Sequence, residues 1–283
     1  TTACSSMQIL NTGAPGYDGA VSFDHGVASG DPMSDRVVIW TRVTPADAGL
    51  GPVPVNWGVS RNEDFSEPVA KGYVLTGEDR DFTVKVDVEG LAPGETYYYW
   101  FWTGQTASRS GRTKTLPVGG LDDYKMAVVS CSNLPFGFFN AYREIAKRED
   151  LDAVIHLGDY FYEYGVNGYG GSIGQQLGRN HEPEHETVTL ADYRVRHAQY
   201  KSDPDLQAAH VAAPWFCTWD DHESTNNSYR TGAENHQPET EGDWTQRKAE
   251  AVQAYLEWMP VRDPVAGRAR EAIYRKGDIG APA

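Results

Sequence analysis

Three short apolar runs of the sequence each end in side chains that bind metal ions or transfer protons in many proteins. These side chains are Cys131 after the first run, Asp159 and Tyr162 after the second, and Asp220, Asp221, His222 and Glu223 after the third. Acids and a histidine directly after an aromatic run are costly to bury without partners. If the runs are neighbouring parallel strands, their carboxyl ends meet at one edge of a sheet, where α/β folds bind ligands. The sequence therefore predicts one shared metal site.

The donor types indicate which ions this site would hold. The thiolate of Cys131 and the phenolate of Tyr162 are strong anionic donors, which favour Fe³⁺. The carboxylates of Asp220 and Asp221, completed by amide or water oxygens, suit a harder cation, so one or two Ca²⁺ ions are expected. Asp159 lies between the two groups and is predicted to bridge them. Zn²⁺ and Mn²⁺ remain alternatives.

A site with two kinds of metal ion suggests a reaction at phosphorus. Such a site activates a water molecule and holds the phosphoryl oxygens while the ester oxygen is displaced. His222, flanked by acids, would protonate the leaving alkoxide or stabilise the transition state. Asp159, as the bridge, is the second residue on which catalysis would depend. Asn226 is a candidate substrate contact.

Several of these patterns also have a purely structural interpretation. Gly158-Asp159 can form a capped turn at a strand end, with the nearby tyrosines packed in the core. Asp24-His25, in a glycine-rich stretch, is more often a capped turn than a ligand pair. His181 and His185 lie in a polar segment and are expected on an exposed loop rather than at a metal. The two other strand ends favour the functional interpretation of the second one.

Composition narrows the class of protein. The chain has 283 residues, a formal net charge of −15 and a pI of about 4.9. An acidic surface repels polyphosphate chains, so nucleic acid is not expected as a stable partner. The sequence has no run of about 18 apolar residues, so no membrane-spanning segment is expected. The three cysteines exclude a dense disulfide framework, and Cys217, inside an apolar run, is expected to be a small core residue.

The elements that would position the site follow an N-terminal arm. Residues 1–20 are polar and glycine-rich and predict a mobile arm, in which Thr1–Cys4 could be the remnant of an export segment or a lipid anchor. Residues 21–117 carry short strands without helical periodicity, which predicts a β-sandwich of the fibronectin-III or immunoglobulin type. Residues 88–99 resemble the tyrosine corner of such a sandwich. The expected strands are 37–43, 53–60 with Pro54 marking an edge, 82–88 and 97–102.

A linker at 118–124 separates the sandwich from a region in which the spacing of apolar residues changes. From 125 to 283 strands alternate with helices, which predicts a right-handed β-α-β unit and the first part of an α/β domain. The segment 165–188 is expected to be a long loop, and a strand beginning at 273 without a following helix indicates an unfinished domain. The other expected elements are strands at 125–131, 153–157 and 215–219, and helices at 138–148, 189–209 with a break at Asp203-Pro204, and 243–259.

Four stretches of the sequence occur together in a known family. They are 23–32 through 40–43, Ser130-Cys131-Ser132-Asn133, residues 156–165 with Gly158-Asp159-Tyr160-Phe161-Tyr162-Glu163, and Thr218-Trp219-Asp220-Asp221-His222-Glu223 with Asn226-Asn227. With these motifs the chain resembles the alkaline phosphatase D family of calcineurin-like metallophosphoesterases from about residue 21 to its end. The resemblance implies a β-sandwich followed by a catalytic domain that is a four-layer α/β/β/α fold when complete. It also implies an Fe³⁺ and Ca²⁺ centre, export to the periplasm or the outside of the cell, and hydrolysis of phosphate mono- and diesters.

The resemblance also implies roles for single residues. Cys131, Asp159 and Tyr162 match the iron ligands of the family, with Asp159 also as the bridge between the ions. Asp221 stands where general metallophosphoesterases place a metal-binding asparagine, and His222 stands at their transition-state histidine. The residue before Asp221 replaces a glycine of that general motif.

The family completes its site with histidine and aspartate motifs in its C-terminal half, and this sequence ends before them. A separate chain that carries the remainder is therefore expected as a partner, beside a small phosphate ester as the substrate. The leading hypothesis is a secreted metal-dependent phosphatase or phosphodiesterase. The alternatives are a phospholipase-D-like diesterase on the same scaffold and a non-catalytic binding module with a degenerate site.

Overall fold

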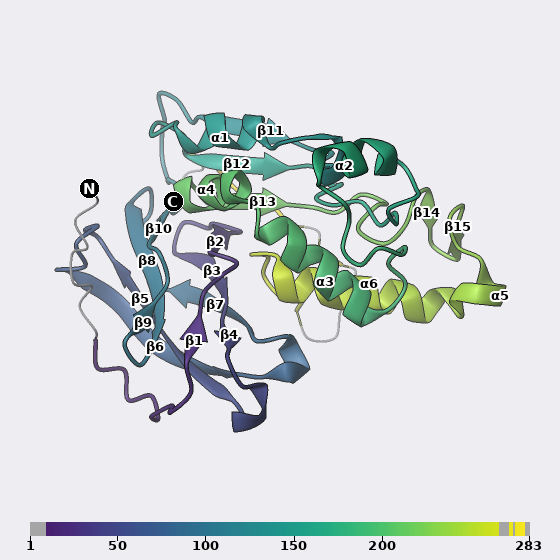
Figure 1. Cartoon of the computed structure of the whole chain (residues 1–283). Helices are drawn as coiled ribbons and strands as arrows, with labels where there is room; N and C mark the ends of the chain where they lie inside the picture. The colour runs from purple at the N-terminus through teal and green to yellow at the C-terminus, as the bar shows by residue number, and fades with distance from the viewer. Residues whose placement is uncertain (1–9, 266–271, 274, 281–283) are drawn as a thin grey trace.

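The computed structural model describes residues 10–265, 272–273 and 275–280 (Figure 1). Figure 1 shows the strands of the N-terminal part, in purple and blue, below the teal and green elements of the second part. The yellow-green helix near the C-terminal end runs beneath the second part. The two parts are connected through a sheet that contains strands from both.

This mixed sheet has six strands, which are β2 (Val27–Gly30), β3 (Arg36–Arg42), β7 (Thr83–Glu89), β11 (Met126–Val129), β12 (Ala153–His156) and β13 (Trp215–Cys217). Their order in the sheet is β11-β12-β13-β2-β3-β7. The strands β11, β12, β13 and β2 run parallel, and β3 and β7 continue the sheet in antiparallel pairs. The sheet therefore contains strands from both sides of the predicted linker. The exact domain boundaries stay a prediction.

The junction between β13 and β2 depends on a close approach of two backbones. Trp215 pairs with Gly30, and the amide of Asp31 donates to the carbonyl of Trp215 at 3.0 Å. A Cβ atom on Gly30 would lie 2.6 Å from that carbonyl oxygen and 2.2 Å from the carbonyl oxygen of Pro260. Only glycine leaves room for this contact. The junction is not visible in the sequence because its two sides are far apart in the chain.

A second sheet faces β2, β3 and β7 and completes a sandwich. Its strands are β5 (Val53–Ser60), β6 (Pro68–Thr76), β8 (Thr96–Thr103), β9 (Thr106–Ala107) and β10 (Gly111–Lys114), in the order β10-β8-β5-β6 with β9 beside β8. Buried apolar side chains from both sheets, among them Val37, Val55 and Tyr99, form one core. Short pairs are made by β1 (Val21–Ser22) with β4 (Thr44–Pro45) and by β14 (Ser228–Tyr229) with β15 (Gly232–Ala233).

The four strands expected in the N-terminal part are confirmed as β3, β5, β7 and β8. The expectation that Pro54 marks an edge is wrong, because β5 lies between β6 and β8. Pro54 pairs with Leu75 of β6, while the ladder between β5 and β8 begins at Asn56. The proline is tolerated because it lies outside the ladder with β8, where its missing N–H group would otherwise cost a hydrogen bond.

The predicted tyrosine corner is also confirmed. The hydroxyl of Tyr97 accepts a hydrogen bond from the backbone amide of Ala92 at 2.9 Å, and Tyr97 is buried. The bond ties the loop before β8 to the strand that follows it.

Replacement of Tyr97 by phenylalanine is expected to lower the free energy of unfolding by about 1 kcal/mol, because the amide of Ala92 loses its acceptor. Urea denaturation of the two proteins measures this difference. The matched control is Tyr73→Phe at a position on β6 that is 42% exposed, and this change should leave stability as it is. Equal stability of Tyr97→Phe and the parent protein would contradict the role of the corner.

The helices are α1 (Asn140–Ala146), α2 (Gly171–Leu177), α3 (Leu190–Lys201), α4 (Pro204–Ala212), α5 (Pro238–Glu241) and α6 (Trp244–Trp258), with 3-10 turns at Ala48–Leu50, Glu78–Arg80 and Leu134–Phe136. Side chains of α1, α3, α4 and α6 pack on β12 and β13, where Val154, Trp215 and Cys217 are buried. Cys217 is thus the core residue that was expected. The described residues supply one sheet and one helix layer of this part, so the four-layer arrangement stays a prediction.

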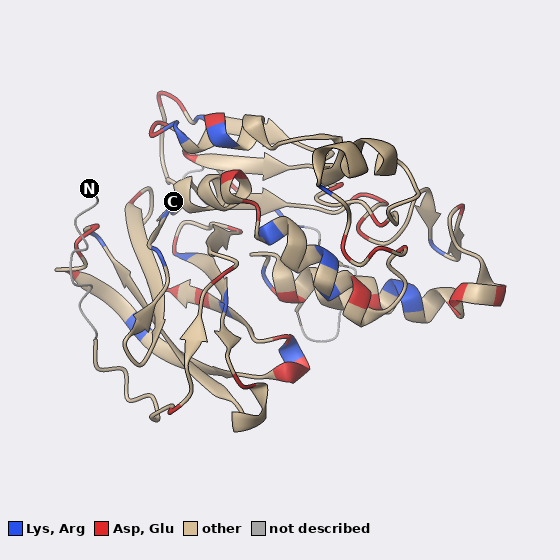
Figure 2. Ribbon diagram, viewed as in Figure 1, with Lys and Arg blue, Asp and Glu red and all other residues tan. Residues whose placement is uncertain are grey.

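Local signals set the limits of these helices. Thr189 caps α3 through the amide of Asp192 in a capping box, and Asp203 caps α4 in front of Pro204. This division of the helical segment is the break predicted at Asp203-Pro204. The helices α3 and α6 pack together, and Arg194 pairs with Glu257 across them at 2.8 Å. Figure 2 shows charges of both signs along these two helices.

Several expectations differ from the structure or fall outside its described residues. The segment 165–188 is not a simple loop, because it contains α2. Residues 10–20 form neither helix nor strand, and Tyr17 packs against the sandwich core. The expected strand at 273 is absent from Ile273 and Arg275, while Tyr274 and Cys4 lie outside the described residues. None of the described helices is long and apolar enough to cross a lipid bilayer.

Candidate metal centre

Backbone hydrogen bonds hold the ends of β11, β12 and β13 side by side. The amide of Cys131 donates to the carbonyl of Gly158 at 3.2 Å, and the amide of Thr218 donates to the carbonyl of His156 at 3.0 Å. Cys131 and Asp159 both have positive φ angles, of 60° and 53°. Non-glycine residues adopt such angles at a local energetic cost, which is often found at functional sites. The chain thus turns sharply after β11 and after β12.

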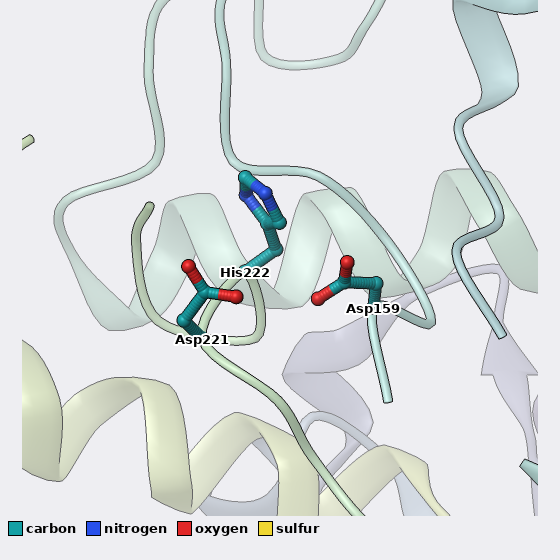
Figure 3. Close-up of side chains that lie close together, drawn as sticks. All are labelled: Asp159, Asp221 and His222. Carbon is teal, nitrogen blue, oxygen red and sulfur yellow. The ribbon is translucent and has the colours of Figure 1, made fainter. Parts of the chain in front are cut away.

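The strand ends bring together four of the five predicted ligands. The hydroxyl of Tyr162 donates to Oδ2 of Asp159 at 3.2 Å, and Sγ of Cys131 lies 3.5 Å from the same oxygen. Ligand atoms of Asp159, Asp221 and His222 lie within 4.8 Å of one another. Figure 3 shows the carboxylates of Asp159 and Asp221 pointing toward each other, with His222 beside them. Asp159 is therefore the common member of both groups, and its role as a bridge between two ions stays a prediction.

The state of Asp159 fits a bound cation. Its Oδ1 atom is buried and has no hydrogen-bond partner in the part of the chain that the structure describes. Burial, together with the charge of Asp221, raises the pKa of Asp159 above its ordinary value. Burial, together with the charge of Asp159, also raises the pKa of Tyr162. A cation would pair with the unpartnered oxygen and offset the repulsion between the acids, so the residues present fit a metal.

His222 is fixed by the carboxylate of Glu163, which has no predicted role of its own. Nδ1 of His222 lies 2.6 Å from Oε2 of Glu163, which is fully buried. Burial lowers the pKa of His222, but the hydrogen bond and charge of Glu163 and the charges of the two aspartates outweigh it, and the net shift is upward. The other oxygen of Glu163 accepts from the amide of Asn226 at 2.7 Å and from Oγ1 of Thr225 at 3.2 Å. Glu163 therefore sets both the position and the charge of the histidine.

A second buried acid shapes the backbone of the site. Glu223 accepts hydrogen bonds from the amides of Asp159 at 3.1 Å, Tyr160 at 2.6 Å and Asp220 at 2.8 Å. Burial raises the pKa of Glu223 to about 7. Through these hydrogen bonds the carboxyl group of Glu223 connects the turn after β12 with the turn after β13. A charged residue directly after Asp221-His222 was visible in the sequence, but its partners were not.

Gly158 allows these two turns to meet. Its φ angle is +110°, and a Cβ atom there would lie 2.4 Å from the backbone nitrogen of Asp220. Both facts require glycine, because a side chain would push the turns apart.

Gly158→Ala is expected to lower the free energy of unfolding by about 3 kcal/mol through backbone strain and steric overlap. Thermal or urea denaturation measures the loss. Gly120→Ala is the matched control, because a Cβ atom on Gly120 has nothing within 4 Å, and it should change stability by less than about 1 kcal/mol. A Gly158→Ala protein as stable as this control would contradict the close contact.

Other predicted site residues lie outside the group around Asp159. The side chain of Asp220 is exposed and is not among the ligand atoms that lie close together in the described structure. Asn226 is placed beside the site through its backbone amide, which donates to Glu163. Cys131 is exposed, whereas Tyr162 is buried. Asp220 and Asn226 thus stay predictions without support from the geometry.

The histidines considered as alternative ligands have other contacts. His181 is buried, not exposed as expected, and its ring nitrogens contact the carbonyl of Tyr164 at 2.7 Å and the hydroxyl of Tyr200 at 3.1 Å. His185 lies 3.0 Å from Asp192, at the surface. In Asp24-His25, the carboxylate accepts from Ser22 at 2.7 Å and the ring packs edge-on against Trp258. Polar contacts thus account for His181 and His185 without a metal, whereas the buried Nδ1 of His25 has no hydrogen-bond partner among the described residues.

Comparison with known proteins places the chain in a family. Residues 126–283 match the model of the PhoD-like phosphatase family, and residues 11–117 match the model of the N-terminal domain of PhoD-like phosphatases. The chain belongs to the PhoD-like phosphatase family. The resemblance drawn from the sequence motifs is thereby confirmed.

Two relatives show how much of the family's length is present. Alkaline phosphatase D of Bacillus subtilis (strain 168) is 45% identical over 256 residues, which cover 88% of this chain and 43% of that protein. A solved structure, described as the structure of PhoD, has 42% identity and a TM-score of 0.80 over 93% of this chain and 50% of that chain. This chain thus spans half or less of the length of these PhoD-like relatives. Since each relative is itself one longer chain, a separate chain for the remainder is not supported.

Proposed function

We propose that this PhoD-like phosphatase hydrolyses phosphate mono- and diesters with the help of bound metal ions. The observation that carries the proposal is the position of Asp159, whose carboxylate contacts Cys131 and Tyr162 and has ligand atoms of Asp221 and His222 within 4.8 Å. The name of the relative, alkaline phosphatase D, supports the same class of reaction.

The residues of the candidate centre would divide the ions between them. Cys131 and Tyr162 are proposed to hold Fe³⁺ together with Asp159, because thiolate and phenolate donors favour a trivalent ion. Asp159 and Asp221 are proposed to hold one or two Ca²⁺ ions, with Asp220 as a further candidate, and Zn²⁺ or Mn²⁺ as alternatives. Bound cations supply an activated water and neutralise charge on the phosphoryl oxygens.

The protein's own contribution to the reaction is proposed to centre on His222. Glu163 occupies Nδ1 of the ring, which leaves Nε2 as the nitrogen that can give a proton to the leaving ester oxygen. Burial of Glu163 keeps this orientation fixed. Asn226, held next to the histidine by the same carboxylate, is the proposed substrate contact.

Hydrolysis of p-nitrophenyl phosphate, its bis-ester and phosphatidylcholine tests the proposal. We expect turnover of the nitrophenyl esters, loss of turnover after chelation and recovery after iron and calcium are returned. Charge transfer from thiolate and phenolate to iron would give the loaded protein a purple or brown colour. Preferred cleavage of phosphatidylcholine would favour the phospholipase-D-like alternative. Absence of metal from the isolated protein together with absence of turnover would overturn the proposal in favour of a binding module.

Export to the periplasm or the outside of the cell is also proposed, on the basis of the family resemblance. Fractionation of the source cells, with an antibody against this chain, tests it. Recovery of the protein only from the cytoplasmic fraction would contradict export.

A further inference from the structure

A cavity of about 690 Å³ opens beside the candidate metal centre. Cys131 and Tyr162 lie in its wall and also contact Asp159, so the cavity and the centre share a boundary. The rest of the wall comes from the end of β11, the turn at Leu134–Phe136, the start of α1 and Tyr169. A phosphate ester with its phosphorus at the centre therefore has this cavity as a place for one of its organic groups.

The wall of the cavity is rich in aromatic side chains, and it exposes polar as well as apolar surface. Its large side chains are Val128, Phe136, Phe138, Phe139, Tyr142, Tyr162 and Tyr169. Its described lining contains no Lys, Arg, His, Asp or Glu. A second phosphate or a carboxylate would find no cation there, whereas an aromatic ring would find several rings against which to pack. Two serines, Asn133, Cys131 and the tyrosines also bring polar atoms to the lining.

The aromatic residues at the opening are held in place although they are exposed. Phe136 is 42% and Tyr169 is 59% exposed, and their ring centroids lie 4.9 Å apart. Gly170 permits this pair, because a Cβ atom on it would lie 2.8 Å from the ring of Phe136. The guanidinium of Arg179 lies 4.9 Å from the ring of Phe138, and its charge is paired with Asp203 at 3.1 Å. Exposed rings in fixed positions next to a reaction centre are typical of a binding surface.

We propose that this aromatic cavity binds an aryl group of the substrate ester. The proposal rests on the proposed phosphoesterase function and adds the substrate class. Its basis is the shared boundary with the centre, the lining rich in aromatic side chains and the two fixed rings of Phe136 and Tyr169.

Calorimetric binding of two phosphonates to the metal-loaded protein tests the cavity separately from turnover. Phenylphosphonate and methylphosphonate carry the same phosphonate group, and each has one organic group that differs only in size and aromaticity. We expect phenylphosphonate to bind about tenfold more tightly, as ring packing of this kind predicts. Equal affinities would overturn the aromatic cavity and leave the phosphoesterase function standing. Binding of neither compound would overturn both.

Variants of the two rings at the opening of the cavity test whether these rings cause the tighter binding of phenylphosphonate. Phe136→Ala and Tyr169→Ala remove exposed rings, so both proteins should fold, and each should weaken phenylphosphonate binding about threefold to tenfold while methylphosphonate binding stays the same. Tyr73→Ala, which removes an exposed ring from β6 of the sandwich, should change neither affinity. A phenylphosphonate affinity unchanged by both Phe136→Ala and Tyr169→Ala would overturn the assignment of this wall.

Discussion

Asp159→Ala is expected to lower kcat/KM for p-nitrophenyl phosphate by more than about 100-fold. Loss of a group that only orients a metal ligand costs up to about 100-fold, and loss of a ligand itself should cost more. The carboxylate of Asp159 is the point at which Cys131, Tyr162 and Asp221 meet. Without it, neither proposed ion keeps its full set of donors. The metal content of the variant, measured on the same sample by elemental analysis, should fall together with its activity.

Asp24→Ala provides the control for this experiment. Asp24 is also an acid in a glycine-rich stretch, but it is exposed and accepts a hydrogen bond from Ser22. We expect this variant to keep its metal and its activity. Asp159→Ala with normal turnover would refute the assignment of the centre. Equal losses in both variants would mean that the assay reports general damage rather than the site.

Glu163→Gln is expected to lower kcat by about 100-fold with KM changed by less than about twofold. The amide has the size of the carboxylate, so Asn226 and Thr225 keep an acceptor. His222, in contrast, loses the negative charge beside Nδ1 and faces the neutral amide instead. Its ring then no longer holds the proton at Nδ1. The loss should therefore appear in the chemical step rather than in substrate binding.

Glu163→Ala separates this positioning role from support of the fold. It removes the acceptor of Asn226 and Thr225 as well, so the free energy of unfolding should also fall, by about 3 kcal/mol. Urea denaturation and steady-state kinetics of the two variants give both quantities. A Glu163→Gln protein with parental kcat would show that the carboxylate serves the fold alone.

The elements that carry the site could be predicted because their signals are local. Apolar runs that end in unusual side chains predicted β11, β12 and β13 and placed the donors after them. A parallel arrangement then brought Cys131, Asp159 and Asp221 to one edge. The break at Asp203-Pro204 was visible because a capping residue and a proline stand next to each other.

The supporting residues could not be predicted in the same way. Glu163 acts on a histidine 59 positions away, and Glu223 accepts from the amide of Tyr160, 63 positions away. In the sequence a buried acid looks like a surface acid until its donors are known. The aromatic neighbours of Glu163 were the one local sign that it is buried. Asp220 is the opposite case, because its position next to Asp221 suggested a ligand, its side chain is exposed, and its role as a ligand stays a prediction.

The pairing of β13 with β2 has a consequence for how the protein is made. The chain leaves a ribosome from its N-terminus, so β2 and β3 emerge long before Trp215 can pair with Gly30. Until then the sandwich presents an unpaired strand edge, which can pair with other chains. Contacts between such distant segments also form slowly. The risk of misassembly during biosynthesis is therefore greatest between the emergence of the sandwich and that of the loop that carries Asp221 and His222.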